Sequence, residues 1–220
     1  MAFCSKNRYK AVIFDLDGTL VDTSEGILIS VKETVEHFGY ALLNNEDFMS
    51  FMGGSIYDSF HKFFPDTDSS LMVSYFRKRY SDVHFVEAHP YDSIGYVLKK
   101  LRDEGLKVGV ATFKREDLAR KLIASYPFGN YVNVVCGSDS DGLLTKTDII
   151  KNCLSSLCVI DENDAIMVGD ALNDAIASNR VGMPFVGVTY GYGFRSNEDF
   201  VNIPNIGLVN NLKDLLNIIK

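Results

Sequence analysis

The stretch AVIFDLDGTLVD, residues 11–22, gives the first indication of both fold and chemistry. Its apolar residues 11–14 lead directly into Asp15, and Asp17, Gly18 and Thr19 follow closely. A short apolar run bounded in this way predicts a buried strand. A strand that only built a core would end in a turn without two neighbouring carboxylates. The stretch therefore indicates a strand that delivers reactive groups at its carboxyl end.

Similar apolar, β-branched runs recur along the chain, bounded by Gly or Asp. Between most of them the apolar residues have a helical period, as in the stripe of Ile94, Val97, Leu98 and Leu101. Strands that alternate with helices predict an α/β fold with a doubly wound parallel sheet. Buried strands are expected at 11–14, 106–112, 131–137, 165–169 and 184–188, and further helices at about 118–123, 148–157, 174–179 and 212–219.

One segment, from about Asp22 to Val86, breaks this alternation. It has no clear strand but has helical stripes, and glycines and a proline punctuate it. A plain crossover needs only about a dozen residues, far fewer than this segment has. We therefore expect an inserted α-helical cap domain at 21–85, over the active-site face of a catalytic core formed by residues 1–20 and 86–220.

Composition limits the class of protein and its partners. The chain has 220 residues, 46% hydrophobic and 23% charged, which is typical of a globular protein with a sizeable core. A net charge of −7 argues against a general nucleic-acid or anionic-membrane surface. No apolar run approaches the roughly 20 residues of a membrane span, and the N-terminus does not resemble a signal peptide. We expect no nucleic-acid or membrane partner, and a monomer or weak dimer.

The cysteines indicate a reduced environment. They form no CxxC pair, and no histidines stand at zinc-finger spacing from them. Buried thiols in a cytoplasmic protein are the simplest interpretation. The residues concerned are Cys4, Cys136, Cys153 and Cys158.

The first acidic pair suggests a metal. Residues two apart in an extended strand point to the same side, so Asp15 and Asp17 would crowd two like charges. Mg²⁺ prefers oxygen ligands and would relieve this repulsion. Ligands of open α/β sheets bind at the carboxyl ends of strands, where this pair lies. Gly18 permits a tight turn whose amides can face an anion.

A second acidic pair, Asp170 and Asp174 in IMVGDALND, follows another expected strand. Their spacing of four places them on one helical face if a helix starts near Asp170. Together the two pairs favour a metal site. Asp174 can also be explained as an acid at a helix N-terminus.

Two further residues complete a set suited to phosphate. Thr112 ends the strand VGVAT and offers a hydroxyl to a phosphate oxygen. Lys146 precedes an expected helix and can add a positive charge beside the same oxygens. Lys114 is the rival lysine, and we expect it to be solvent-facing or peripheral.

Taken together, these motifs resemble those of the haloacid dehalogenase superfamily of phosphohydrolases, in the branch similar to phosphoglycolate phosphatases with a helical cap. The resemblance extends over most of the chain, and as a set the motifs are specific. The matching residues are Asp15, Asp17, Gly18 and Thr19 for D-x-D-G-T, Thr112 and Lys146 for the isolated threonine and lysine, and Gly169, Asp170 and Asp174 for G-D-x-x-x-D.

The resemblance implies a mechanism for these residues. Asp15 would attack phosphorus and form an aspartyl-phosphate, and Asp17 would act as general acid and then as general base. Mg²⁺ would be held by the Asp15 carboxylate, the Asp17 backbone carbonyl and Asp170, with Asp174 close by or acting through water. Gly18, Thr112 and Lys146 would bind the phosphate oxygens.

The substrate class stays open. A small phosphorylated metabolite is expected, such as phosphoglycolate or a nucleoside monophosphate, which would make the chain a 5'-nucleotidase. A phosphomutase of the β-phosphoglucomutase type and a non-catalytic phosphate-ester binding protein are alternatives. Phe113 stands where the family commonly has a small polar residue. The stretch YGYGF, 190–194, follows the last expected strand and either borders the site or only shapes turns.

Overall fold

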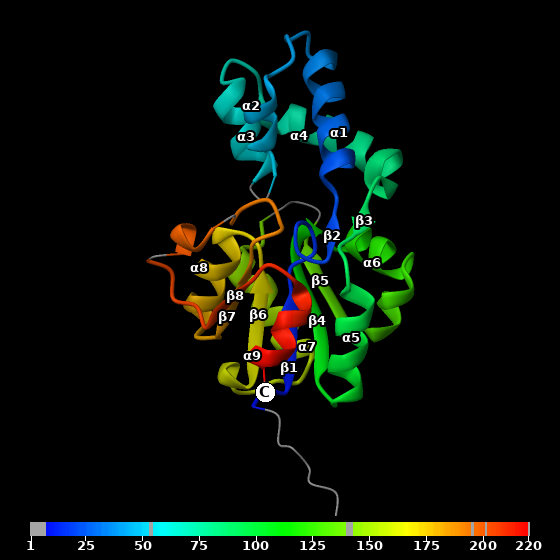
Figure 1. Ribbon diagram of the computed structural model, residues 1–220. Helices are drawn as coiled ribbons and strands as arrows, with labels where there is room; N and C mark the ends of the chain where they lie inside the picture. The colour runs from blue at the N-terminus through cyan, green and yellow to red at the C-terminus, as the bar shows by residue number, and fades with distance from the viewer. Residues whose placement is uncertain (1–7, 53–54, 140–142, 195, 201, 220) are drawn as a thin grey trace, which may run out of the picture. The chain divides into compact units, whose positions relative to one another are not determined.

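The computed structural model describes residues 8–52, 55–139, 143–194, 196–200 and 202–219, and its elements are labelled in Figure 1. Over this part of the chain there are two compact units. The core unit contains the residues up to Leu20 and from Pro90 onward, and the helical unit is Val21–His89. The expected insertion was 21–85.

A parallel sheet forms the centre of the core unit. Its strands are β1 (Ala11–Phe14), β4 (Lys107–Arg115), β5 (Val134–Ser138), β6 (Ala165–Gly169), β7 (Phe185–Val188) and β8 (Gly207–Val209). Within the described residues these six strands lie in the order β5-β4-β1-β6-β7-β8, each parallel to its neighbours. The chain runs outward from β1 to β5 and then returns to the other side of β1. The order therefore reverses between β1 and β6, where doubly wound sheets bind ligands.

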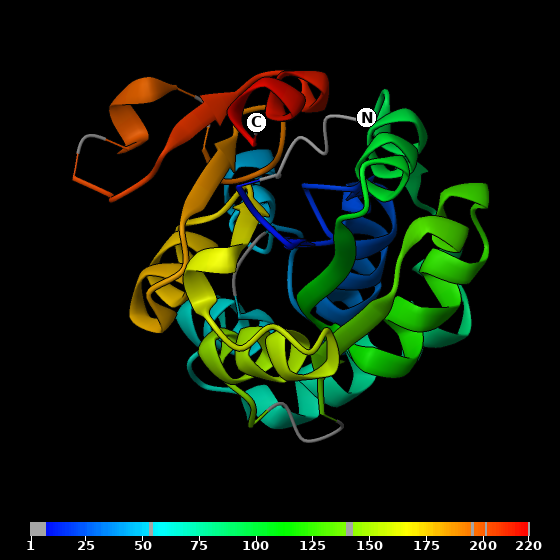
Figure 2. The same ribbon diagram turned by 90° about the horizontal axis from the view of Figure 1, so that it is seen from below.

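Helices cover both faces of this sheet. They are α5 (Ile94–Asp103), α6 (Glu116–Ala124), α7 (Lys146–Ser156) and α8 (Leu172–Val181), followed by the short α9 (Leu215–Ile218). Figure 2 shows α7 and α8 together on one face, with α5 and α6 on the other. Under α7, the fully buried Ile13 and Met167 of the sheet pack with Ile149 and Cys153 of the helix. The doubly wound α/β fold is confirmed.

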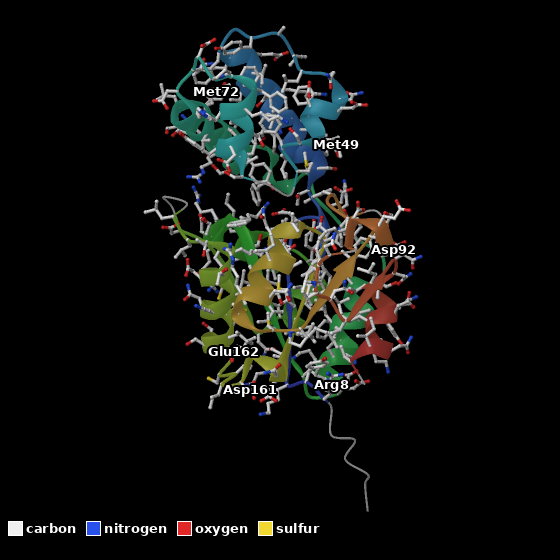
Figure 3. All side chains as sticks on the ribbon, turned by 90° about the vertical axis from the view of Figure 1, so that its left-hand side faces the viewer. Arg8, Met49, Met72, Asp92, Asp161 and Glu162 are labelled. Carbon is white, nitrogen blue, oxygen red and sulfur yellow. The ribbon has the colours of Figure 1, made fainter. Side chains whose placement is uncertain are left out.

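The two ends of the sheet differ in chemistry. Figure 3 shows Arg8, Asp161 and Glu162 at the end where β1 and β6 begin. At the other end, β1 and β6 deliver Asp15 and Asp170, which are both buried. Buried acids need compensation, whereas exposed ones do not, so the carboxyl end of the sheet is where a functional site is expected.

The helical unit consists of α1 (Ser24–His37), α2 (Asn45–Met49), α3 (Ile56–Phe63) and α4 (Ser69–Asp82), with a 3₁₀ turn at His84–Val86. The Asp68 side chain caps α4 by accepting from the Ser70 N–H at 2.8 Å. Inside the unit, the fully buried Phe60 ring packs on Phe51 and Phe76. The insertion is helical, as expected, with its own small aromatic core.

Several element boundaries differ from the prediction. β4 continues past Thr112 to Arg115, α7 begins at Lys146 itself, and α8 begins at Leu172, two residues before the expected start at about 174. β8 was not predicted, because only three residues form it and two of them are half-buried. The short strands β2 (Val21–Asp22) and β3 (His89–Pro90), which pair with each other, were also missed.

No helix among the described residues is both long and apolar enough to cross a membrane. Cys136, Cys153 and Cys158 are free thiols, and Cys4 lies outside the described residues.

Candidate active site

Asp15 and Lys146 form the centre of the site. Asp15 directly follows β1, and its N–H donates to the Val168 carbonyl of β6 at 2.9 Å, which fixes the chain end between the two strands. Lys146 is the first residue of α7, and its Nζ donates to Asp15 Oδ1 at 2.8 Å. Only 4% of the Lys146 side chain is exposed, so this ion pair is largely shielded from solvent.

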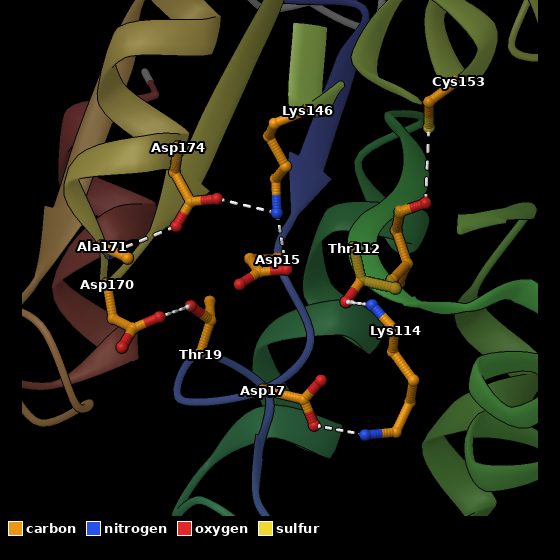
Figure 4. A network of polar contacts seen from close by, with 11 residues as sticks. Asp15, Asp17, Thr19, Thr112, Lys114, Lys146, Cys153, Asp170, Ala171 and Asp174 are labelled. Carbon is orange, nitrogen blue, oxygen red and sulfur yellow. Dashed lines mark hydrogen bonds and ion pairs between the residues drawn. The ribbon is translucent and has the colours of Figure 1, made fainter. Parts of the chain in front are cut away.

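Asp170 and Asp174 approach the same lysine and acid from β6 and α8. Lys146 Nζ lies 2.8 Å from Asp174 Oδ1, and the Ala171 N–H donates to Asp174 Oδ2 at 3.1 Å (Figure 4). Among the described residues, Asp15, Asp170 and Asp174 each offer a carboxylate oxygen, and these oxygens lie within 4.8 Å of one another. Asp174 therefore lies in the first turn of α8, where it bonds a backbone amide, and also belongs to the acidic cluster.

The electrostatics of the cluster follow from burial. Desolvation raises the pKa of Asp15 to about 7, although Lys146 acts in the opposite direction. Burial likewise raises the pKa of Asp170 to about 6 and raises that of Asp174. For Lys146, burial acts to lower the pKa, but the charges of Asp15 and Asp174 outweigh it and the pKa is raised. The single positive charge of Lys146 does not neutralise three buried carboxylates. A bound cation, or protons on the carboxyl groups, would neutralise the remaining negative charge.

Asp17 takes a different partner. The Lys114 Nζ donates to Asp17 Oδ1 at 2.7 Å, and 6% and 19% of the two side chains are exposed. The prediction that Lys114 is solvent-facing or peripheral was wrong. Because β4 continues beyond Thr112, Lys114 stays close to the sheet and reaches the turn that follows β1. Asp15 and Asp17 therefore bind different lysines, and the expected crowding of their side chains is relieved.

Thr112 and Gly18 lie at the same end of the sheet. Thr112 is buried, and its Oγ1 accepts from the Lys114 N–H at 3.1 Å, which leaves its own hydroxyl proton for donation. Gly18 has a φ of 82°, and a Cβ there would lie 2.4 Å from Asp170 Oδ2. Only glycine combines this conformation with such a close approach to the carboxylate.

Sequence reasoning missed how Asp170 is held. Its Oδ1 accepts from the Thr19 hydroxyl at 3.1 Å, and its Oδ2 accepts from the N–H groups of Tyr192 and Gly193 at 2.7 and 3.3 Å. Thr19 belongs to a recognised motif but was given no role of its own. The stretch 190–194 was considered as a border of the site, and its glycines were the available signal.

The donors of this cluster fit a hard divalent cation. They are carboxylate oxygens on buried aspartates, and they stand where the sheet order reverses. Asp15, Asp170 and Asp174 would hold such an ion. Among the described residues, the Asp17 side chain does not belong to this cluster, because it bonds Lys114 instead.

The comparisons with known proteins agree with this geometry. Residues 12–188 match the family model of haloacid dehalogenase-like hydrolases. A phosphoglycolate phosphatase of Aquifex aeolicus is 28% identical over 83% of this chain and 86% of its own length. A 5'-nucleotidase of Pseudomonas aeruginosa is 30% identical over 84% of this chain and 85% of its own.

A crystal structure described as a predicted phosphatase from Clostridium acetobutylicum is 33% identical, with a TM-score of 0.86, and the match covers 94% of this chain and 96% of that one. The chain belongs to the haloacid dehalogenase-like hydrolase family, as a phosphatase of its phosphoglycolate phosphatase-like branch.

Proposed function

We propose that the protein is a Mg²⁺-dependent phosphatase that hydrolyses the phosphomonoester of a small metabolite through an aspartyl-phosphate on Asp15. The observation that carries this proposal is the buried cluster of Asp15, Asp170 and Asp174 around Lys146, at the point where the sheet order reverses. Mg²⁺, when bound, would neutralise charge on the carboxylates and on the phosphoryl oxygens.

In the first half-reaction, a carboxylate oxygen of Asp15 attacks phosphorus, and the bond from phosphorus to the ester oxygen breaks. Lys146 and the Thr112 hydroxyl stabilise the charge on the transferring oxygens. Asp17 protonates the departing alcohol. The assignment of different roles to the two acids is supported by their separate placement, with Asp15 beside Lys146 and Asp17 beside Lys114.

In the second half-reaction, Asp17 as a carboxylate takes a proton from water, and the water attacks the phosphorus of the aspartyl-phosphate. Asp15 leaves as a carboxylate and inorganic phosphate is released. The Lys114 ammonium, 2.7 Å from Asp17 Oδ1, offsets the charge on Asp17 between the two steps. The two half-reactions thus return every residue to its starting state.

The helical unit would act as a cap that selects the leaving group. It begins at Val21, directly after the turn that carries Asp17, Gly18 and Thr19. The named activities of the relatives support phosphoglycolate as a first substrate to test and a nucleoside monophosphate as a second. A cytoplasmic location remains a prediction from the cysteine pattern.

The test is phosphate release from a panel of esters that includes phosphoglycolate, a nucleoside monophosphate and p-nitrophenyl phosphate, with Mg²⁺ and with chelator. We expect metal-dependent release, and a loss on the order of 10³-fold or more in Asp15→Asn, because the nucleophile is removed. Asp161→Asn, an exposed acid at the opposite end of the sheet, is the matched control and should keep full activity.

Two results would contradict the proposal. Full turnover by Asp15→Asn would exclude the covalent route. Isomerisation of a sugar phosphate in the presence of its bisphosphate, without net phosphate release, would show a phosphomutase instead.

A further inference from the structure

The loop at residues 190–193, between β7 and the 3₁₀ turn at Asn197–Phe200, closes around the Asp170 side chain. Its Tyr192 and Gly193 N–H groups donate to Asp170 Oδ2, and the Phe194 N–H donates to the Asp170 carbonyl at 2.8 Å. Side chain and main chain of Asp170 are thus both bonded to a segment that lies more than twenty residues further along the chain.

The glycines of this loop allow the close approach. A Cβ on Gly191 would lie 2.3 Å from the Gly18 carbonyl oxygen and 2.6 Å from Asp170 Oδ2. A Cβ on Gly193 would lie 2.6 Å from the Asp170 carbonyl oxygen. Since real Cβ atoms essentially never approach so closely, any side chain at Gly191 must displace Asp170 or the turn after β1.

The same turn supplies the remaining donor to the carboxylate. The Thr19 hydroxyl donates to Asp170 Oδ1 at 3.1 Å, and the Tyr190 hydroxyl donates to the Thr19 carbonyl at 2.8 Å. Tyr190 in turn packs on Tyr91, with ring centroids 4.7 Å apart. The loop therefore holds both Asp170 and the residue that bonds its other oxygen.

The two oxygens of Asp170 are not equivalent. A carboxylate has about four lone-pair sites, about two on each oxygen. Among the described residues, two backbone N–H groups bond Oδ2, and a Cβ on Gly191 would lie 2.6 Å from it. Of the described donors to Asp170, only the Thr19 hydroxyl bonds Oδ1. Oδ1 thus keeps a lone pair that can bind a cation.

We infer that the 190–193 loop and Thr19 are positioning elements that orient Asp170 so that Oδ1 is the oxygen offered to the divalent cation. This inference rests on the proposed function, since that function supplies the metal site. The groups that hold a metal ligand affect affinity strongly, because they fix its direction before the ion arrives.

The test is direct Mg²⁺ binding to chelator-treated protein by isothermal titration calorimetry with MgCl₂. Gly191→Ala should raise the Kd about 10–100-fold, the range seen when support of a metal ligand is lost. Thr19→Val, which keeps the side-chain shape but removes the donor, should also raise the Kd, by about 10-fold, the lower end of the same range. Gly95→Ala is the matched control, because a Cβ there meets nothing closer than 3.8 Å, and its Kd should equal that of the wild type.

The outcomes separate this inference from the proposed function. If Asp170→Asn loses Mg²⁺ binding while Gly191→Ala and Thr19→Val keep the wild-type Kd, the metal site stands and the inference is overturned. If Asp170→Asn binds as the wild type does, both are overturned. Circular dichroism checks folding. If Gly191→Ala does not fold, Thr19→Val alone tests the inference: a raised Kd supports it, and the wild-type Kd overturns it.

Discussion

Lys146 compensates the charge of the buried acids, because its ammonium bonds both Asp15 and Asp174. Removing one partner of a buried ion pair leaves the other uncompensated, which commonly costs about 3–5 kcal/mol. We expect Lys146→Met to lower the free energy of unfolding by about 3 kcal/mol in chelator and by less in saturating Mg²⁺, since the cation replaces part of the lost charge. Urea unfolding with and without Mg²⁺ measures this, and an equal loss in both conditions would contradict it.

Lys114 allows a test of the role given to Asp17. Without its partner at 2.7 Å, the Asp17 carboxyl loses the contact that fixes it. We expect Lys114→Met to lower kcat/KM about 10–100-fold on an alkyl phosphate, whose leaving group needs a proton, and far less on p-nitrophenyl phosphate, whose leaving group does not. Lys121→Met, an exposed lysine of α6, is the control. An equal loss on both esters would contradict the assignment.

The residues of the site were predicted unevenly, for a physical reason. Asp15, Asp170, Asp174 and Lys146 belong to motifs, and the structure brings them together. Lys114 was misjudged because its burial depends on how far β4 extends, which no local pattern indicates. The backbone donors to Asp170 were missed because the glycines of 190–194 indicate a turn but not which residue, more than twenty positions away, its N–H groups bond.

At the level of elements, the start of α7 determines where Lys146 lies. Thr145 Oγ1 accepts from the Asp148 N–H at 3.2 Å, and Asp148 Oδ2 accepts from the Thr145 N–H at 3.1 Å, which together form a capping box. The helix therefore begins at Lys146, with its side chain directed at Asp15. Precise capping here is part of the site.

We expect Thr145→Ala to destabilise the protein by about 1 kcal/mol, because a first-turn amide loses its acceptor. Thr147→Ala, two residues further on in the same turn, should change stability by less than about 0.5 kcal/mol. Chemical denaturation measures both. Equal effects of the two substitutions would show that the cap does not stabilise α7.

The strands were predicted better than the ends of the elements. β1 and β6 were predicted with their observed bounds, since Asp and Gly stop each apolar run. The start of β5 was placed at Tyr131, but residues 127–131 form a 3₁₀ turn because the run does not distinguish a strand from the turn leading into it. The pairing of each strand with its neighbours in the sheet sets these boundaries, and a single sequence does not show that pairing.

For the whole molecule, the buried acids predict an unusual pH dependence without metal. The raised pKa values of Asp15, Asp170 and Asp174 mean that the folded state binds more protons than the unfolded state between about pH 4 and pH 7. Stability must therefore fall as pH rises through this window. Carboxyl groups whose pKa is lowered, such as Glu33 bonded to Arg79, act in the opposite sense only at the acidic end of this window and below it.

We expect the Tm of chelator-treated protein to be higher at about pH 5.5 than at about pH 7.5. Mg²⁺ should reduce or reverse this difference, because it stabilises the ionised cluster, by about 2.7 kcal/mol at a concentration 100 times its Kd. Asp170→Asn should flatten the dependence. A Tm in chelator that rises with pH over this interval would contradict the charge balance described for the site.

The most direct test of the account is to look for phosphate on Asp15 itself. A reaction with p-nitrophenyl phosphate, whose leaving group needs no proton, is quenched in acid, digested and examined by mass spectrometry. The wild type is compared with Asp17→Asn, in which only the second half-reaction should then be slowed. We predict a phosphoryl group on Asp15, more abundant in Asp17→Asn and absent from Asp15→Asn. Measurable turnover with no phosphorylated Asp15 in either protein would contradict the covalent mechanism.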